Sequence, residues 1–189
     1  MLEKIEDLDV SLFVYLNGLG SETFDKFWLI ITNQLNWTPF FLLMFFLIYR
    51  KVGGKQLLFL LLFIAVLIAF TDQTTNLVKH TFERLRPCNN PEIKSFIRIV
   101  KARSSFSFFS GHAANTMAVS TFLFLVLKRH FKYFGFLFLW PLIFAYSRIY
   151  LGLHYPGDIL AGYFFGAIFG FLIFKIYQNL KPKYFPDTV

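Results

Sequence analysis

The 189-residue chain has a single cysteine and few charged residues, and both shortages limit what it can be. Cys88 has no second cysteine to pair with, so an intramolecular disulfide and a cysteine-based metal cluster are both excluded. Only 16% of the residues are charged, against about 25% in a typical soluble domain. Hydrophobic residues make up 56%, and several apolar stretches approach the roughly 20 residues that cross a bilayer. We therefore expect an integral membrane protein.

The chain also lacks repeats, low-complexity linkers and any marked change of composition, so residues 1–189 are expected to form one domain. A cleavable signal peptide is not expected, because residues 1–9 are acidic and no apolar stretch follows a basic start. The net charge of +8 would favour nucleic acid on a soluble protein. Here the basic residues fall in loops between apolar segments. Membrane topology and anionic lipids explain them better, and no nucleic-acid partner is expected.

Residues 1–22 mix acidic and apolar side chains at helical spacing, and the pattern ends at the turn-forming residues 17–20. This favours a short helix that lies in the membrane interface. A loosely ordered tail is the alternative.

Five apolar segments follow, and the expected fold is all-α: a polytopic membrane bundle of about five transmembrane helices plus the N-terminal interfacial helix. The first segment, residues 24–49, has a polar middle and contains Pro39. These features predict a kink, or a surface helix leading into a crossing that begins near Trp37. The other four predicted crossings are residues 56–82, 111–127, 133–150 and 156–180.

Basic residues fall on both faces of this predicted bundle. Eight lie in two tight loops and the tail on one face: Arg50, Lys51, Lys55, Lys128, Arg129, Lys132, Lys181 and Lys183. Ten lie on the other face: Lys4, Lys26, Lys79, Arg84, Arg86, Lys94, Arg98, Lys101, Arg103 and Arg148. The count alone does not decide the orientation. Because the tight loops have no other use for their charges, we expect their face to be cytoplasmic.

Three cations, Lys79, Arg86 and Arg148, are predicted to lie at helix ends on the same membrane face. A phosphoryl group in transfer spreads negative charge over its oxygens, and fixed cations in a water-poor site stabilise that charge. Arginine suits bidentate phosphate contacts and lysine acts as a point charge. Anchoring at the membrane interface is the alternative role, above all for Lys79.

Ser110-Gly111-His112 is typical of a helix start on that same face. Ser110 is a favourable N-cap, and Gly111 lets the backbone approach a ligand closely. The free N–H groups of the first turn and the helix dipole favour an anion. His112 would then be placed to give a proton to an oxygen of a phosphate ester; a capped helix with an incidental histidine is the alternative.

His154 and Asp158 are four residues apart around Pro156, which is favoured in the first turn of a helix. The carboxylate can accept a hydrogen bond from one ring nitrogen and leave the other as a nucleophile. The same logic orients catalytic histidines elsewhere. An interface histidine beside a helix-start acid is the alternative. Asp72, in the second predicted crossing, is interpreted as a structural or supporting partner of a nearby group, not as a catalytic residue.

Together these residues resemble the type 2 phosphatidic acid phosphatase superfamily of integral-membrane lipid phosphatases, with signatures K-x6-R-P, P-S-G-H and S-R-x5-H-x3-D. The first matches at Lys79, Arg86 and Pro87. The third matches at Ser147, Arg148, His154 and Asp158, and the second at Ser110, Gly111 and His112. Phe109 stands where the family usually has proline, a departure that concerns loop rigidity and no catalytic atom. The resemblance spans residues 79–158.

The resemblance implies a metal-independent phosphatase without a cofactor. In it, His154 would form a phosphohistidine, Asp158 would orient His154, and His112 would be the general acid. The remaining site residues would hold the phosphate oxygens: Lys79, Arg86, Ser110, Gly111 and Arg148. The expected substrate is a lipid phosphate or pyrophosphate at the outer face of a bacterial inner membrane. Candidates are undecaprenyl pyrophosphate, phosphatidylglycerol phosphate, phosphatidic acid and the lipid A phosphates.

Two other functions fit parts of the pattern. A lipid phosphotransferase would use the same site with an alcohol in place of water. A transporter or non-catalytic lipid-binding protein would use the cations only to hold anions, and would not need both histidines and Asp158. The soluble vanadate-dependent haloperoxidases of the superfamily are excluded by the apolar composition. The sequence gives no indication of the oligomeric state.

Overall fold

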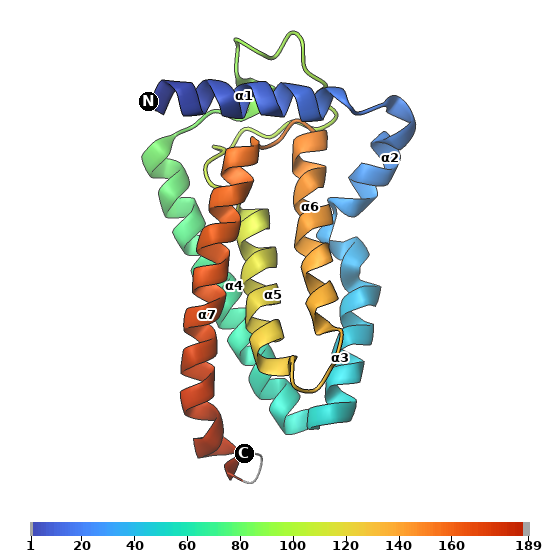
Figure 1. Ribbon diagram of the computed structural model, residues 1–189, viewed down its shortest axis with the longest axis vertical. Helices are drawn as coiled ribbons and strands as arrows, with labels where there is room; N and C mark the ends of the chain where they lie inside the picture. The colour runs from blue at the N-terminus through green and yellow to red at the C-terminus, as the bar shows by residue number, and fades with distance from the viewer. Residues whose placement is uncertain (1, 187–189) are drawn as a thin grey trace.

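The structure, a computed structural model, describes residues 2–186, and within this range it contains helices, turns and loops but no strand. Five apolar helical segments run side by side as a bundle, and one amphipathic helix lies across an end of it (Figure 1). The predicted all-α fold with an N-terminal helix is confirmed.

The helix that lies across the end of the bundle is α1 (Leu2–Gly18), which ends four residues before the predicted limit at residue 22. Its charged side chains near the start are exposed, whereas Phe13 and Asn17 are fully buried. Phe13 packs edge-on against Tyr155, with ring centroids 5.4 Å apart. The Asn17 amide donates to the backbone carbonyls of Arg98, Ile149 and Tyr150 at 3.0–3.1 Å. These contacts hold α1 on the bundle, so the segment is not a loose tail.

The first apolar segment is broken, as its polar middle predicted. The helix α2 (Glu22–Ile31) and the segment formed by η1 (Gln34–Trp37) and α3 (Thr38–Val52) meet at an angle of 69°. At the break, Asn36 and the Trp37 indole donate to the carbonyls of Ile30 and Ile31, each at 2.8 Å. These side chains replace the helical hydrogen bonds that the bend removes.

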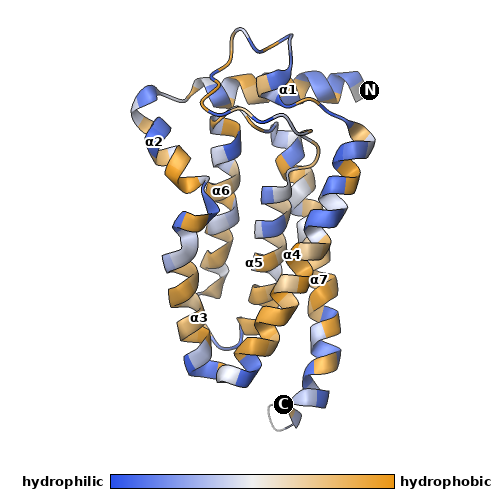
Figure 2. Cartoon of the chain, turned by 180° about the vertical axis from the view of Figure 1, so that it is seen from behind, coloured by the Kyte–Doolittle hydropathy of each residue, from blue (hydrophilic) through white to orange (hydrophobic). Residues whose placement is uncertain are grey.

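The remaining helices are α4 (Gly54–Phe82), α5 (Gly111–Leu127), α6 (Leu139–Tyr150) and α7 (Pro156–Tyr184), with η3 (Phe134–Phe138) leading into α6. α4 and α7 are long and apolar enough to cross a membrane, and the bent α2–α3 pair meets the same criterion when taken as one span. Residues 111–127 and 134–150 form shorter apolar helices. The apolar bands of these helices lie at similar heights (Figure 2). The count of five crossings stays a prediction.

α5 lies inside the bundle and packs most closely against α7. Three glycines of α7, spaced four residues apart, allow this close packing: Gly162, Gly166 and Gly170. Small residues let the backbones of membrane helices approach one another. A Cβ atom at Gly166 would lie 2.3 Å from the carbonyl oxygen of Ala114, and one at Gly170 would lie 2.4 Å from that of Ala118. The close contact fixes the start of α5 beside the start of α7.

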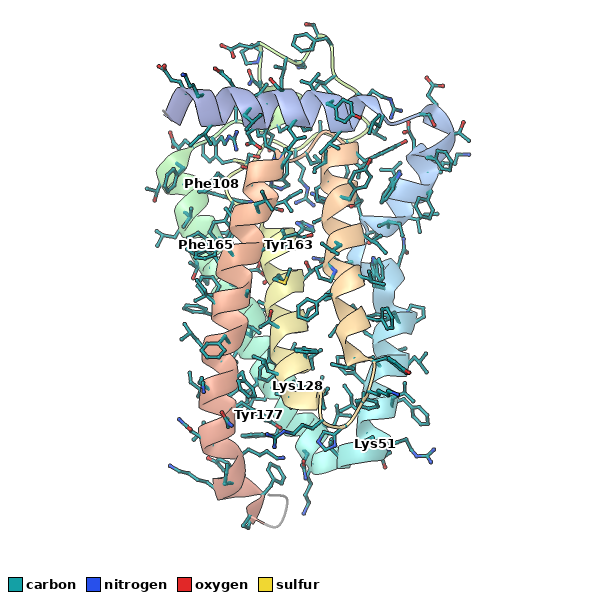
Figure 3. The ribbon with its side chains drawn as sticks, in the orientation of Figure 1. Lys51, Phe108, Lys128, Tyr163, Phe165 and Tyr177 are labelled. Carbon is teal, nitrogen blue, oxygen red and sulfur yellow. The ribbon has the colours of Figure 1, made fainter. Side chains whose placement is uncertain are left out.

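The chain order brings four helix ends to the end of the bundle that α1 covers: the end of α4, the start of α5, the end of α6 and the start of α7 (Figure 1). The loop 83–110, which includes η2 (Pro87–Asn89), lies at the same end. Lys51 and Lys128 lie at the opposite end (Figure 3). Every residue singled out by the three motifs is therefore at or near one end.

Candidate active site

A cavity of about 1060 Å³ begins at this end and extends between α3, α4, α5 and α6. Cationic and polar groups line its outer part: Lys79, Arg86, Arg103, Gly111 and His112. Aromatic and aliphatic side chains line its inner part: Phe41, Leu42, Phe45, Leu61, Ile64 and Ile68. The cavity thus offers anion-binding groups at one end and hydrocarbon at the other.

His154 lies behind the polar end, fully buried in the short turn between α6 and α7. The backbone N–H groups of Leu153 and His154 donate to the Arg148 carbonyl at 2.9 and 3.3 Å. Asp158 is one turn into α7, and its Oδ2 lies 3.4 Å from His154 Nδ1. The same oxygen accepts the Tyr155 N–H at 2.9 Å. Asp158 therefore links the start of α7 to the Nδ1 edge of the His154 ring.

Arg86 fixes which nitrogen of His154 carries the proton. Its Nη1 lies 2.8 Å from His154 Nε2, and it also donates to the Leu153 carbonyl at 2.8 Å. A guanidinium can only donate hydrogen bonds, so Nε2 must present its lone pair. This assignment from the hydrogen-bond network places the proton on Nδ1, toward Asp158. The Nε2 lone pair therefore lies on the side of the cations.

Burial lowers the pKa of His154 well below its ordinary value, and the positive charges of Arg86, Arg148, Lys79 and Arg103 lower it further. The imidazole is therefore neutral at physiological pH, which a nucleophilic nitrogen requires. The same charges make the surroundings strongly attractive to an anion.

Arg148 is almost completely buried near the end of α6. Its Nη1 donates to the Thr32 hydroxyl at 2.5 Å, whereas Nε and Nη2 are buried without a partner in the part of the chain that the structure describes. Unpaired N–H groups on a buried cation cost free energy, because they have lost their hydrogen bonds to water without forming others. An oxyanion beside them would supply the missing acceptors.

The start of α5 has the capped form that the sequence predicts. The Ser110 hydroxyl accepts the Ala113 N–H at 3.4 Å, and the Ser110 N–H donates to the Asp158 carbonyl at 3.0 Å. Within the described residues, the N–H groups of Gly111 and His112 have no acceptor. The His112 ring stacks on Phe144, with centroids 5.6 Å apart.

Not every predicted site residue reaches the cavity. Lys79, Arg86, Gly111 and His112 line it. Ser110, Arg148, His154 and Asp158 form the packed layer behind it. Arg86 connects the two groups, since it lines the cavity and contacts His154.

Two residues that the sequence interpretation missed hold Asp158. Arg84 Nη1 donates to Asp158 Oδ1 at 2.8 Å, and Arg84 Nη2 donates to Oδ2 of Asp9 on α1 at 2.8 Å. The Ser107 hydroxyl donates to Asp158 Oδ2 and lies 3.3 Å from His154 Nδ1. Arg84 carried a weak signal, as a cation two residues before Arg86, whereas Ser107 lies in an irregular loop and carried none.

Two further sequence expectations concern Phe109 and Asp72. Phe109 is buried and stacks on Phe165 of α7, with centroids 5.2 Å apart, so an aromatic contact stands where the family has proline. Figure 3 shows Phe165 on α7, on the side that faces the loop carrying Phe108. Asp72 accepts a hydrogen bond from the Asn115 amide at 2.6 Å. The partner of Asp72 is thus an amide on α5.

Within residues 2–186, no group of three or more His, Cys, Asp or Glu side chains is arranged to hold a metal ion. The polar groups at the outer end of the cavity are instead cations, histidines and free N–H groups, a set that suits an anionic ligand.

The helical membrane bundle and its anion-binding site with two histidines are the features of a membrane phosphatase, and comparisons with known proteins agree. The model of the PAP2 superfamily matches residues 56–182. A lipid A 4'-phosphatase from Bacteroides thetaiotaomicron is 34% identical over 193 residues, covering 100% of this chain and 85% of the relative. A lipid A 4'-phosphatase from Porphyromonas gingivalis is 27% identical over 188 residues, covering 97% and 78%.

A solved structure has the same fold. It is the crystal structure of a transmembrane PAP2-type phosphatidylglycerolphosphate phosphatase from Bacillus subtilis, with a TM-score of 0.70. Its sequence identity is 21%, and the match covers 94% of this chain and 88% of that one. The chain therefore belongs to the PAP2 superfamily, as its motifs predicted, and it is a membrane hydrolase of phosphoric esters.

Proposed function

We propose that this protein removes a phosphate from a lipid through a phosphohistidine formed on His154, and that its substrate is the 4'-phosphate of a lipid A. The observation that carries the mechanism is the buried Arg148, whose Nε and Nη2 lack acceptors beside a neutral histidine. A phosphoryl group would provide those acceptors and the negative charge that the four cations attract.

The reaction begins with attack of His154 Nε2 on phosphorus. In the free protein Arg86 donates to this nitrogen, so Arg86 must turn its N–H group to a phosphate oxygen when the substrate binds. The bond between phosphorus and the ester oxygen breaks, and His112 protonates the departing oxygen. Asp158 stabilises the positive charge that develops on the His154 ring.

Water completes the cycle. His112, now neutral, takes a proton from a water molecule that attacks the phosphorus of the phosphohistidine. The bond between phosphorus and Nε2 breaks, and inorganic phosphate and neutral His154 are released. Lys79, Arg86, Arg148 and the free N–H groups of Gly111 and His112 stabilise the phosphoryl oxygens in both steps. The Ser110 cap fixes where those two N–H groups point.

One observation supports a lipid A phosphate over the other candidate lipids, and a second supports a lipid substrate in general. The two relatives described above, which match 97–100% of this chain, are both named lipid A 4'-phosphatases. In addition, the cavity continues from the cations into an apolar region lined by α3 and α4, where acyl chains can lie beside a headgroup.

The proposed location is the inner membrane of a bacterium, with the site on the outer, periplasmic side. Lys51 and Lys128 belong to the tight basic loops at the end opposite the site (Figure 3). Positive loops without another role favour the cytoplasmic face, which would place α1 and the cavity entrance outside.

The test is phosphate release from purified lipid A in detergent, with EDTA present. We expect turnover by the wild type and loss of at least about 1,000-fold in His154→Asn, because the attacking nitrogen is gone. His112→Asn should lose about 100- to 10,000-fold, the usual contribution of a general acid. His130→Asn is the matched control, since His130 is exposed in the loop at the opposite end.

Full turnover by His154→Asn would refute the assignment of His154 as the nucleophile. Phosphate release from phosphatidylglycerol phosphate but not from lipid A would refute the substrate and leave the mechanism standing. Formation of a new phosphodiester when an acceptor alcohol is added, with little free phosphate, would identify a phosphotransferase instead.

A further inference from the structure

A polar cluster lies deeper in the cavity than the groups that the phosphate chemistry uses. Asp72 and Thr75 of α4 and Asn115 of α5 all line the cavity. Asp72 Oδ1 accepts a hydrogen bond from Asn115 Nδ2 at 2.6 Å. The other carboxylate oxygen has no partner among the described residues, and Asn115 Oδ1 is buried without one. The cluster therefore contains two acceptors without a donor, one on the exposed Asp72 and one buried on Asn115.

Thr75 is unlike the other threonines of α4. The hydroxyls of Thr71, Thr74 and Thr81 each donate to the backbone carbonyl four residues earlier, at 2.8–3.0 Å. This bond is the usual way for a threonine in an apolar helix to satisfy its hydroxyl. Thr75 is only 2% exposed, yet its hydroxyl makes no such bond and has no partner within residues 2–186. Its hydroxyl is therefore a buried polar group without a hydrogen-bond partner, on a residue that lines the cavity.

The cluster is next to the phosphate end, not separate from it. Asp72, Thr75 and Lys79 share one face of α4, and Asp72 is seven residues from Lys79, about 10 Å along the axis. Asn115 is three residues from His112, about 4.5 Å along α5. The methyl group of Thr75 lies 3.1 Å from where a Cβ of Gly111 would be. A headgroup attached to a bound phosphate would extend over these residues.

The chemistry of the cluster selects the kind of headgroup. A carboxylate near the binding site of an anion is unfavourable for the phosphate itself, so Asp72 serves a neighbouring part of the ligand. Its free oxygen is exposed and can accept a donor from a ligand, and the buried oxygen of Asn115 lacks one. A hydrocarbon chain at this depth would leave all three polar groups unpaired, which costs free energy.

We propose that Asp72, Thr75 and Asn115 form a headgroup subsite that binds hydroxyl or amide N–H donors next to the scissile phosphate. Building on the proposed function, this subsite makes the protein selective for phosphorylated sugar lipids over lipids whose phosphate is attached directly to a hydrocarbon chain, such as prenyl phosphates. It acts on substrate binding and leaves the phosphoryl chemistry to the groups at the cavity entrance.

The experiment compares lipid A with inorganic vanadate, a phosphate mimic that has no headgroup. In Asn115→Leu, Asp72→Leu and Thr75→Val, we expect the KM for lipid A to rise about 10-fold or more, the loss expected for a hydrogen bond to a charged or buried group. The inhibition constant of vanadate should stay within twofold of the wild-type value. Gln73→Leu, an exposed change on α4 outside the cavity lining, is the matched control.

Each outcome decides between the accounts. An unchanged KM in all three variants would overturn the subsite. A parallel loss of lipid A turnover and vanadate inhibition would also overturn it, because Asp72 and Asn115 would then only join α4 to α5. If vanadate does not inhibit the wild type, the histidine-based phosphate site itself fails, and the proposed function fails with it.

Discussion

Replacing Arg84 by methionine should lower both the stability of the protein and the rate of phosphate release. The Arg84 guanidinium joins two carboxylates, one on α1 and one on α7, through bonds of 2.8 Å to Asp9 and to Asp158. It also lies 4.1 Å from the centre of the Tyr155 ring. Asp158 is fully buried, so without Arg84 its charge would lose its only cationic hydrogen-bond partner among the described residues.

The expected cost is dominated by Asp158. Breaking a buried ion pair by removing one partner costs about 3–5 kcal/mol. The bond to Asp9 is partly exposed and adds about 0–1 kcal/mol. For a protein of this size, the two losses together lower the Tm by roughly 6–24 °C. Activity should fall about 10- to 100-fold, as when the outer partner of an active-site group is removed.

The assay is the Tm and the kcat of the variant in detergent micelles, measured beside Arg84→Lys and Lys94→Met. A lysine can reach one carboxylate but lacks the planar fork that reaches two, so Arg84→Lys should recover only part of each loss. Lys94 is exposed in the same loop and its side chain makes no hydrogen bond or ion pair with the described residues, so Lys94→Met should behave as the wild type. Wild-type Tm and kcat in Arg84→Met would refute the reasoning.

Two other predictions concern packing and pH. Gly166→Val should separate α5 from α7 and lower the Tm strongly, because its Cβ would lie 2.3 Å from the Ala114 carbonyl oxygen. Gly135→Ala should leave the Tm unchanged, since the nearest atom to its Cβ is 3.9 Å away. Equal Tm values for the two variants would contradict this account of the packing. Because the pKa of His154 is held below its ordinary value, the imidazole takes up a proton near pH 6.5 in the unfolded chain but stays neutral at that pH in the folded protein. Stability should therefore be lost progressively as the pH falls below about 6.5, and should not change for this reason above it. His154→Asn should remove this part of the pH dependence of the Tm, and the same slope in both proteins would contradict it.

The helix boundaries nearest the site could be predicted because they depend on local chemistry. Ser110 caps α5 and Pro156 starts α7, and both helices begin where these residues predict. The bend between α2 and α3 followed from polar residues in an apolar segment. Because successive helices of a bundle run in opposite directions, the helix ends that carry the three motifs come to the same surface.

The supports of Asp158 could not be predicted, since they depend on contacts across long stretches of chain. Asp9 and Arg84 are 75 residues apart in sequence, and Ser107 reaches Asp158 from an irregular loop. Loops have no periodicity from which a side-chain direction can be read. In the same way, the side-chain amide of Asn17 donates to carbonyls of the loop and of α6 and accepts the Arg98 N–H, and these contacts depend on a fold that sequence patterns do not specify.

The most direct test of the account is to find the covalent intermediate. Protein mixed with lipid A should be quenched within milliseconds, digested and examined by mass spectrometry under alkaline conditions, where phosphohistidine survives. We predict a phosphate on the peptide that contains His154, with none in His154→Asn. Phosphate on another residue, or steady turnover with no phosphorylated peptide, would contradict the account.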